Sequence, residues 1–219
     1  MPDLVKSTKR IQDFEGGSLK VRIAKLETEF EGVNKNKSKL LCSKNGIDDT
    51  LLQSAIVLKK AFGQVNVVIH AIGVIILLPK ILHSREVIES LSLGAGNTGK
   101  KFDLETNLRV AEFKFIHWKG GAESIRQNSL FKDFFYLAEE STNKKRCLYV
   151  IGLDQPLKFL RGDRAITSVL SRNAKLSNDF RNKYRTRFRI VSEYYNYRKH
   201  LVEIIDINQV MPSLASSLP

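Results

Sequence analysis

Asp103, Glu112 and Lys114 have the residue types and the spacing that could hold a divalent cation beside a phosphate group. Side chains alternate along a strand, so Glu112 and Lys114 share one face while their apolar neighbours point to the other. If residues 107–108 form the two-residue loop of a hairpin, Asp103 lies directly opposite Glu112, with about 5 Å between their Cβ atoms. The pattern predicts two facing carboxylates with an ammonium group beside them.

Two facing carboxylates repel each other, and a hard cation that prefers carboxylate, water and phosphate oxygens would relieve this repulsion. Lys114 would position or help deprotonate an attacking water and offset the charge that develops on the phosphate. The alternative is an exposed hairpin face on which Glu112 and Lys114 only keep the strand soluble. Against it, Glu112-Phe113-Lys114 is the only acidic-x-Lys triplet of the chain. We therefore expect a magnesium or manganese site at Asp103 and Glu112.

The most apolar segment, residues 65–82, precedes these residues and has the composition of a possible membrane span. Asn66, His70, Pro79 and Lys80 interrupt it. The apolar run after His70 has about 8 residues, whereas a spanning helix needs roughly 20. We expect a buried helix and no membrane.

The next segments predict strands and a helix around the candidate site. Residues 86–118 form short runs separated by Gly- or Asn-containing turns, which favours three strands. Residues 122–140 return to helical spacing, with Leu130, Phe134 and Leu137 on one stripe. Residues 147–153 are continuously apolar, as in a strand buried on both faces. The predicted order is helix, strand, strand, strand, helix, strand.

Asp103 on one strand and Glu112-Phe113-Lys114 on the next, within this order of elements, resemble the PD-(D/E)xK nuclease superfamily. The resemblance covers residues 65–153, with Phe102 where the nominal pattern has proline. It implies an α/β fold with a restriction-endonuclease-like αβββαβ core, a mixed sheet flanked by helices. It also implies that Asp103 and Glu112 bind the metal and that Lys114 is the catalytic lysine.

The two ends of the chain lie outside that core. The N-terminal residues are polar, with a predicted helix at 19–30 and a connector at 33–45, and Asp48 and Asp49 predict the N-cap of a helix at 50–62. We divide the chain into a helical N-terminal arm with its connector (1–46), the nuclease-like core (47–160) and a basic C-terminal extension packed on the core (161–219). The extension ends in a predicted flexible tail at 211–219.

Other acidic and polar residues could support the site. Gln127 resembles a glutamine that some branches of the superfamily place near the metal, with helix packing or capping as the alternative. Glu89 could add a metal-binding carboxylate and Glu105 a supporting one, or both could face solvent. His70, on an apolar helix, is typical of a hydrogen-bonded core histidine.

Residues just beyond the third strand could contact nucleic acid. Lys119 and Arg126 could bind phosphates, or be plain solvated charges. His117-Trp118 could stack on a nucleotide, although a tryptophan that packs against the next helix is the favoured interpretation.

A glycine-rich segment, residues 94–101, matches both G-x-G-x-x-G and G-x-x-x-x-G-K. A P-loop needs Ser or Thr after its lysine and then a helix, so that backbone N–H groups face the phosphates. Here Lys101 follows Lys100, and an alternating strand pattern comes next. We expect a strand connection and no nucleotide loop.

The charge balance favours a polyanionic partner. The chain has 36 Lys and Arg against 23 Asp and Glu, a net charge of +13. Residues 158–199 hold twelve basic residues and only three acidic ones. Five cations recur there at every second position, and in an extended chain they would share one face toward phosphates: Arg181, Lys183, Arg185, Arg187 and Arg189. A solvated basic face and an anionic lipid surface are the alternatives.

The leading expectation is magnesium-dependent hydrolysis of phosphodiester bonds in DNA, in a restriction, repair or defence role. A catalytically inactive nucleic-acid-binding module of the same fold and an NTP-binding protein are the alternatives. Cys42 and Cys147 support neither a disulfide framework nor a cysteine zinc site. The polar N-terminus does not resemble a signal peptide, so we expect a cytoplasmic protein, and a homodimer is compatible with the sequence.

Overall fold

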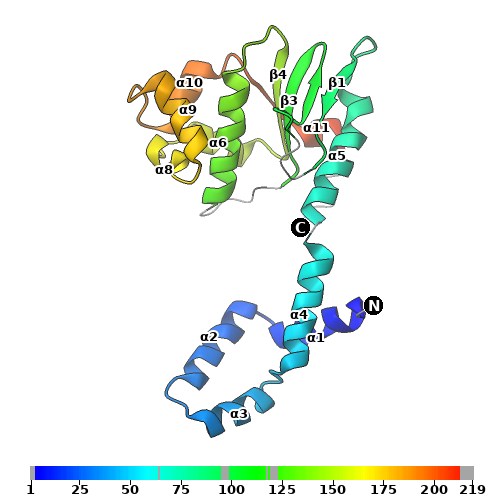
Figure 1. The fold of residues 1–219 in the computed structure, drawn as a ribbon, viewed down its shortest axis with the longest axis vertical. Helices are drawn as coiled ribbons and strands as arrows, with labels where there is room; N and C mark the ends of the chain where they lie inside the picture. Colours follow the sequence, from blue (N-terminus) through cyan, green and yellow to red (C-terminus); the bar gives the residue numbers. More distant parts are fainter. Residues whose placement is uncertain (1–2, 64, 95–98, 117, 119–122, 213–219) are drawn as a thin grey trace. The chain divides into compact units, whose positions relative to one another are not determined.

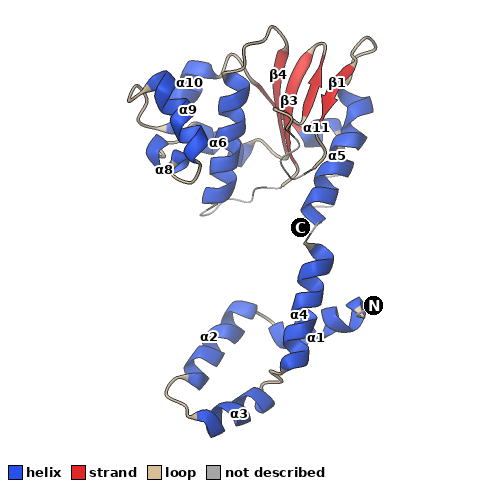
Figure 2. Cartoon of the chain, in the orientation of Figure 1, coloured by secondary structure: helices blue, strands red, loops and turns tan. Residues whose placement is uncertain are grey.

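The computed structural model of the chain describes residues 3–63, 65–94, 99–116, 118 and 123–212. Two units can be distinguished, Met1–Asn66 and Val67–Pro219. In the described residues, the first unit is helical and the second combines helices with one sheet, as Figure 2 shows. Residues 213–219 of the predicted tail lie outside this description.

The first unit contains four helices in its described residues: α1 (Leu4–Glu15), α2 (Leu19–Phe30), α3 (Lys35–Lys44) and α4 (Asp49–Phe62). Asp48 accepts the Leu51 N–H at the start of α4, so its predicted capping role is confirmed, as is the helix at 19–30. The predicted connector is wrong, because Asn34 caps a real helix there. Arg10 of α1 binds Asp48 at 2.6 and 2.7 Å and ties α1 to α4.

The second unit is built on a five-stranded mixed sheet with the order β1-β2-β3-β4-β5. The pairs β1–β2 and β2–β3 are antiparallel, and the pairs β3–β4 and β4–β5 are parallel. Their bounds are β1 (Ile88–Leu91), β2 (Leu104–Thr106), β3 (Arg109–Lys114), β4 (Lys145–Val150) and β5 (Glu203–Asp206). The predicted α/β class, mixed sheet, three consecutive strands and later buried strand are confirmed.

Helices cover both faces of this sheet (Figure 1). One face packs against α5 (Val65–Ile81) and α11 (Ile207–Val210). The other packs against α6 (Ser124–Ala138) and a group of shorter helices: α7 (Asp154–Leu160), α8 (Ile166–Leu170), α9 (Ala174–Tyr184) and α10 (Val191–Arg198). Each face therefore has its own apolar core, and β3 and β4 contribute to both.

The helix α5 is only half buried, which corrects the expectation of a buried helix. Val74 and Leu77 are fully covered, and Gly73 lets the Phe115 ring approach so closely that a Cβ at residue 73 would lie 2.5 Å from it. The opposite side, including Ile72 and Ile76, is exposed. By length and composition alone Asp49–Ile81 could cross a membrane, a test that core helices of soluble proteins also pass.

The C-terminal row of cations is not extended, which corrects a second expectation. The helix α9 continues to Tyr184 because Leu176, Phe180 and Tyr184 recur at helical spacing and bury one face. Asn173 caps its start. The alternation of basic and other residues at 181–189 therefore spans a helix end and a loop, and it does not form one row of cations on an extended chain.

Candidate active site

The β2–β3 hairpin brings Asp103 and Glu112 together. Leu104 pairs with Ala111 and Glu105 with Val110, which confirms the predicted register. Asp103 lies one residue before β2, where the Phe113 N–H donates to its Oδ2 at 3.0 Å. The carboxyl groups of Asp103 and Glu112 are close enough for each to shift the pKa of the other. The two predicted ligands thus form one cluster at the end of the hairpin.

His70 of α5 is part of this cluster. Its Nε2 lies 3.5 Å from Asp103 Oδ1, and its ring stands edge-on to Phe115 with 6.0 Å between centroids. Burial by itself would raise the pKa of Asp103, but the bonds from His70 and the Phe113 N–H outweigh burial and hold that pKa below its ordinary value. A histidine in an apolar helix was interpreted as a core residue, and the tertiary packing makes it a neighbour of the site.

Glu112 has the opposite electrostatic behaviour. Burial, followed by the nearby charges of Asp133 and Asp103, raises its pKa well above the ordinary value, and Lys114 offsets only part of this. The folded protein therefore favours the ionised form of Asp103 and the protonated form of Glu112, compared with ordinary carboxyl groups. A carboxyl group that resists ionisation in this way is typical of a functional site.

Asp133 of α6 is a site residue that the sequence analysis missed. Its side chain is only 1% exposed and forms an ion pair with Lys114, while Lys132 Nζ lies 3.5 Å from the other oxygen. Burial lowers the pKa of Lys114, but Asp133, with Glu112 and Asp103, raises it by more in total, so the ammonium stays charged. The available signal was an acidic residue between Phe131 and Phe134 on the buried face of an apolar helix.

The side chain of Gln127, which was predicted to lie near the metal, binds Arg164 in this structure. Its Oε1 accepts a hydrogen bond from Arg164, and both residues line a hollow of about 360 Å³ together with Trp118 and Lys158. Trp118 is buried and its ring lies 6.0 Å from that of Phe159, which bears out packing as its main role. The hollow adjoins α6, the helix that carries Asp133.

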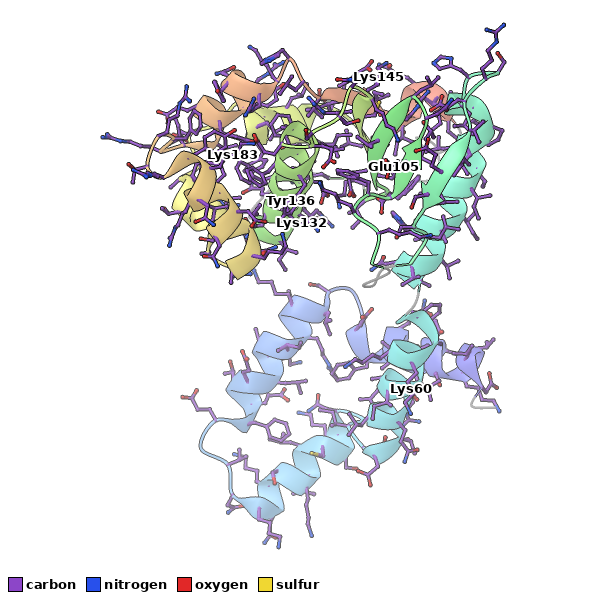
Figure 3. All side chains as sticks on the ribbon, turned by 45° about the horizontal axis from the view of Figure 1, so that its top comes forward. Lys60, Glu105, Lys132, Tyr136, Lys145 and Lys183 are labelled. Atoms are coloured by element: carbon purple, nitrogen blue, oxygen red, sulfur yellow. The ribbon has the colours of Figure 1, made fainter. Side chains whose placement is uncertain are left out.

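Glu89 and Glu105 form a separate cluster. Lys144 Nζ binds Glu89 at 2.6 Å and Glu105 at 2.9 Å. Figure 3 shows Glu105 on the sheet and Lys132 on α6. The assignment of Glu89 as a metal ligand stays a prediction, and in this structure its carboxylate is paired with Lys144. Glu105 belongs to the same ion pair.

The donor chemistry of Asp103 and Glu112 fits a hard divalent cation. Within the described residues there is no group of three or more His, Cys, Asp or Glu side chains arranged to enclose a metal. Magnesium commonly uses only one or two carboxylates and completes its shell with water and substrate phosphate oxygens. The two neighbouring carboxyl groups meet that requirement, and the raised pKa of Glu112 indicates that positive charge would be favoured beside it.

The predicted phosphate contacts divide into paired and free cations. Arg126 binds Glu123, Lys183 binds Glu139, and Arg187 stacks over Tyr197 with 4.3 Å from its guanidinium carbon to the ring centroid. Arg185 and Arg189, with Arg181, line one hollow instead. Lys119 and His117 lie outside the described residues.

The glycine-rich segment does not have the surroundings of a P-loop. Residues 95–98 lie outside the described residues, but Lys100 donates to the Leu91 carbonyl at 2.5 Å and Lys101 pairs with Glu140. The next regular element is β2 and not a helix. Both lysines are therefore engaged by the protein, in agreement with the prediction of a strand connection.

The comparisons with known proteins find no relative of this chain. No family model, no curated protein and no solved structure gives a significant match to the chain.

Proposed function

We propose that the protein is a metal-dependent nuclease that hydrolyses phosphodiester bonds of DNA. The observation that carries the proposal is the pair of neighbouring carboxyl groups of Asp103 and Glu112 on the β2–β3 hairpin, with Lys114 two residues further along the same face of β3. The order of α5, β1–β3, α6 and β4 agrees with the αβββαβ core of restriction-endonuclease-like folds. The net charge of +13 suits a polyanionic substrate.

Each residue of the cluster has a role in this proposal. A magnesium or manganese ion bound by Asp103 and Glu112 would polarise the phosphate and lower the pKa of a bound water. Lys114 acts as a cation, because its raised pKa keeps the ammonium protonated at neutral pH. In that form it stabilises negative charge on the phosphate and cannot deprotonate water. Asp133 keeps Lys114 charged and holds it in place.

The test is cleavage of plasmid DNA, linear DNA and RNA with magnesium, manganese or EDTA. Glu112→Gln and Lys114→Met should each lose at least about a hundredfold in rate, the usual scale for removal of a transition-state charge contact. Lys132→Met is the matched control, because it removes a lysine that also faces Asp133 but lies on α6. Circular dichroism verifies that the variants are folded.

Two outcomes would contradict the proposal. Equal cleavage by wild type and Glu112→Gln would place the activity elsewhere or in a contaminant. Metal-independent DNA binding without cleavage under any condition would favour a catalytically inactive nucleic-acid-binding module of the same fold.

A further inference from the structure

A second polar hollow lies among the C-terminal helices, formed by α8, α9 and the loop after α9. Its volume is about 750 Å³, within the range of small-molecule sites. Three arginines at intervals of four residues line it: Arg181, Arg185 and Arg189. Its walls also include the apolar side chains of Leu170, Phe180 and Phe188. Both features are fixed by the end of α9, where the Arg185 N–H donates to the Arg181 carbonyl at 2.8 Å.

The three guanidinium groups are not neutralised by the protein. Among the described residues, no carboxylate or other acceptor binds the side chains of Arg181, Arg185 or Arg189. Lys183 and Arg198, by contrast, both bind Glu139. In the described part of the basic segment, some cations thus form ion pairs within the fold, whereas others line the hollow.

Glu193, in the first turn of α10, is also committed elsewhere. Glu193 accepts the backbone N–H of Arg189 at 2.6 Å and of Ile190 at 3.4 Å, as part of the start of α10. Its carboxylate therefore fixes the loop that carries Arg189 and does not bind a guanidinium. The positive charge at the hollow is left for a ligand.

Arg185 adopts a strained backbone conformation. Its φ of 50° and ψ of −115° lie in a region that suits glycine, and no other non-glycine residue of the described chain has a positive φ. A glycine at this position would end the helix with less backbone strain. The arginine at this position therefore points to a use of its side chain.

We infer that this hollow binds a nucleotide through a phosphomonoester group. Such a group carries a charge of about −1.5 to −2 near neutral pH and offers three oxygens, which several guanidinium groups can share through paired N–H···O bonds. The partly buried Phe188 and its apolar neighbours form a wall against which a base can lie. The nucleotide is either the phosphorylated end of a nucleic-acid strand or a free nucleotide, and only the first source depends on the proposed nuclease function.

The first test is calorimetric titration of the full chain in EDTA with AMP, adenosine and inorganic phosphate. AMP should bind at least about tenfold more tightly than adenosine, since hydrogen bonds to charged groups dominate. Equal binding of AMP and adenosine would overturn the inference. Inorganic phosphate that binds as tightly as AMP would also overturn it, because the apolar wall would then contribute nothing.

Variants locate the binding. Arg185→Gly and Arg181→Gln should each weaken AMP binding about tenfold or more, the usual effect of losing one charge-assisted contact. Arg185→Gly should do so without lowering the melting temperature, because glycine relieves the strained φ. Lys183→Gln is the control. It also removes one positive charge from α9, but the wild-type Lys183 binds Glu139 and does not line the hollow. An equal loss in Lys183→Gln would indicate diffuse attraction and contradict a built site.

Oligonucleotides distinguish the two sources. Fluorescence anisotropy in EDTA compares single strands of one sequence that end in a phosphate or a hydroxyl group. Preference for the phosphate end, lost in Arg185→Gly, assigns the hollow to a strand end, whereas equal affinity together with AMP binding assigns it to a free nucleotide. Cleavage of DNA without AMP binding would refute only this inference, and AMP binding without cleavage would refute only the nuclease proposal.

Discussion

Two charged clusters lie at opposite ends of β3, and they differ in how well their charges are matched. At the start of the strand, Arg109 binds both oxygens of Glu86, the Tyr149 hydroxyl at 2.8 Å and the Ile81 carbonyl at 2.8 Å. Thr106 adds a hydrogen bond to Glu86 at 2.8 Å. One buried cation thus meets one buried anion, and their partners satisfy the remaining polar atoms.

At the far end of β3 the charges are not balanced in this way. Three carboxyl groups, of Asp103, Glu112 and Asp133, gather around Lys114, and the pKa of Glu112 is raised because burial and its acidic neighbours oppose ionisation. Burial would raise the pKa of Glu86 too, but hydrogen bonds from Arg109, the His83 N–H and Thr106 lower it to about 2. The comparison indicates that the first cluster supports the fold and that the second retains a demand for positive charge, as a cation site should.

The largest effect is expected at the matched cluster. Arg109→Leu should lower the free energy of unfolding by about 3–5 kcal/mol, because Glu86 would remain buried without its cation. The contribution of Glu86 should be present above its ordinary pKa near 4.5 and fade as the pH falls toward about 2. Urea denaturation at several pH values measures both. Arg85→Leu, at an exposed neighbour, is the control, and an equal loss there would contradict the assignment.

Loss of Lys114 should be the next largest effect on stability. Lys114→Met leaves Asp133 with Lys132 as its remaining cation, and we expect a loss of about 2–3 kcal/mol for a poorly paired buried carboxylate. The double variant Lys114→Met/Asp133→Asn should recover part of that loss while cleavage stays absent. If the double variant is as unstable as the single one, the interaction between the two side chains does not carry the effect.

Glu112→Gln should stabilise the protein at neutral pH, by roughly 1 kcal/mol or more for each unit by which the folded state raises the pKa. The folded state of the wild type binds the Glu112 proton more tightly than the unfolded state does, so wild-type stability falls as the pH rises above the ordinary pKa of glutamate. Thermal melts near pH 4 and pH 7.5 should show the gain only at the higher value. Magnesium should raise the wild-type melting temperature more than that of the variant, and Glu105→Gln should show neither effect.

Asp103→Asn should have a smaller effect on stability, of opposite sign. It weakens the acceptor for the Phe113 N–H and the contact with His70, so we expect a loss of about 1 kcal/mol at neutral pH. The pKa of Asp103 is lowered in the folded state, so this contribution should disappear as the pH falls below the ordinary aspartate value. Chemical denaturation of both site variants in parallel checks the signs. Variants that shift stability in the same direction would show that the two carboxyl groups are electrostatically equivalent.

Local patterns in the sequence were enough to predict the hairpin and its register. The alternation around Glu112, the two-residue turn at 107–108 and the cap at Asp48 act over a few residues, and the backbone geometry of strands, turns and helix ends follows from them. The facing of Asp103 and Glu112 therefore needed no knowledge of the rest of the fold. The same local reasoning failed at residues 181–189, where a period of two in the charges coincided with a period of four in the buried residues.

Only the tertiary structure decided which residues surround the hairpin. His70 and Asp133 belong to helices on opposite faces of the sheet, and their approach to Asp103 and Lys114 depends on how α5 and α6 pack. The same packing pairs Glu89 with Lys144, and it leaves three arginines around one hollow without acidic partners among the described residues. Burial and long-range charge contacts determine pKa values and ion pairs, and neither is encoded in the spacing of neighbouring residues.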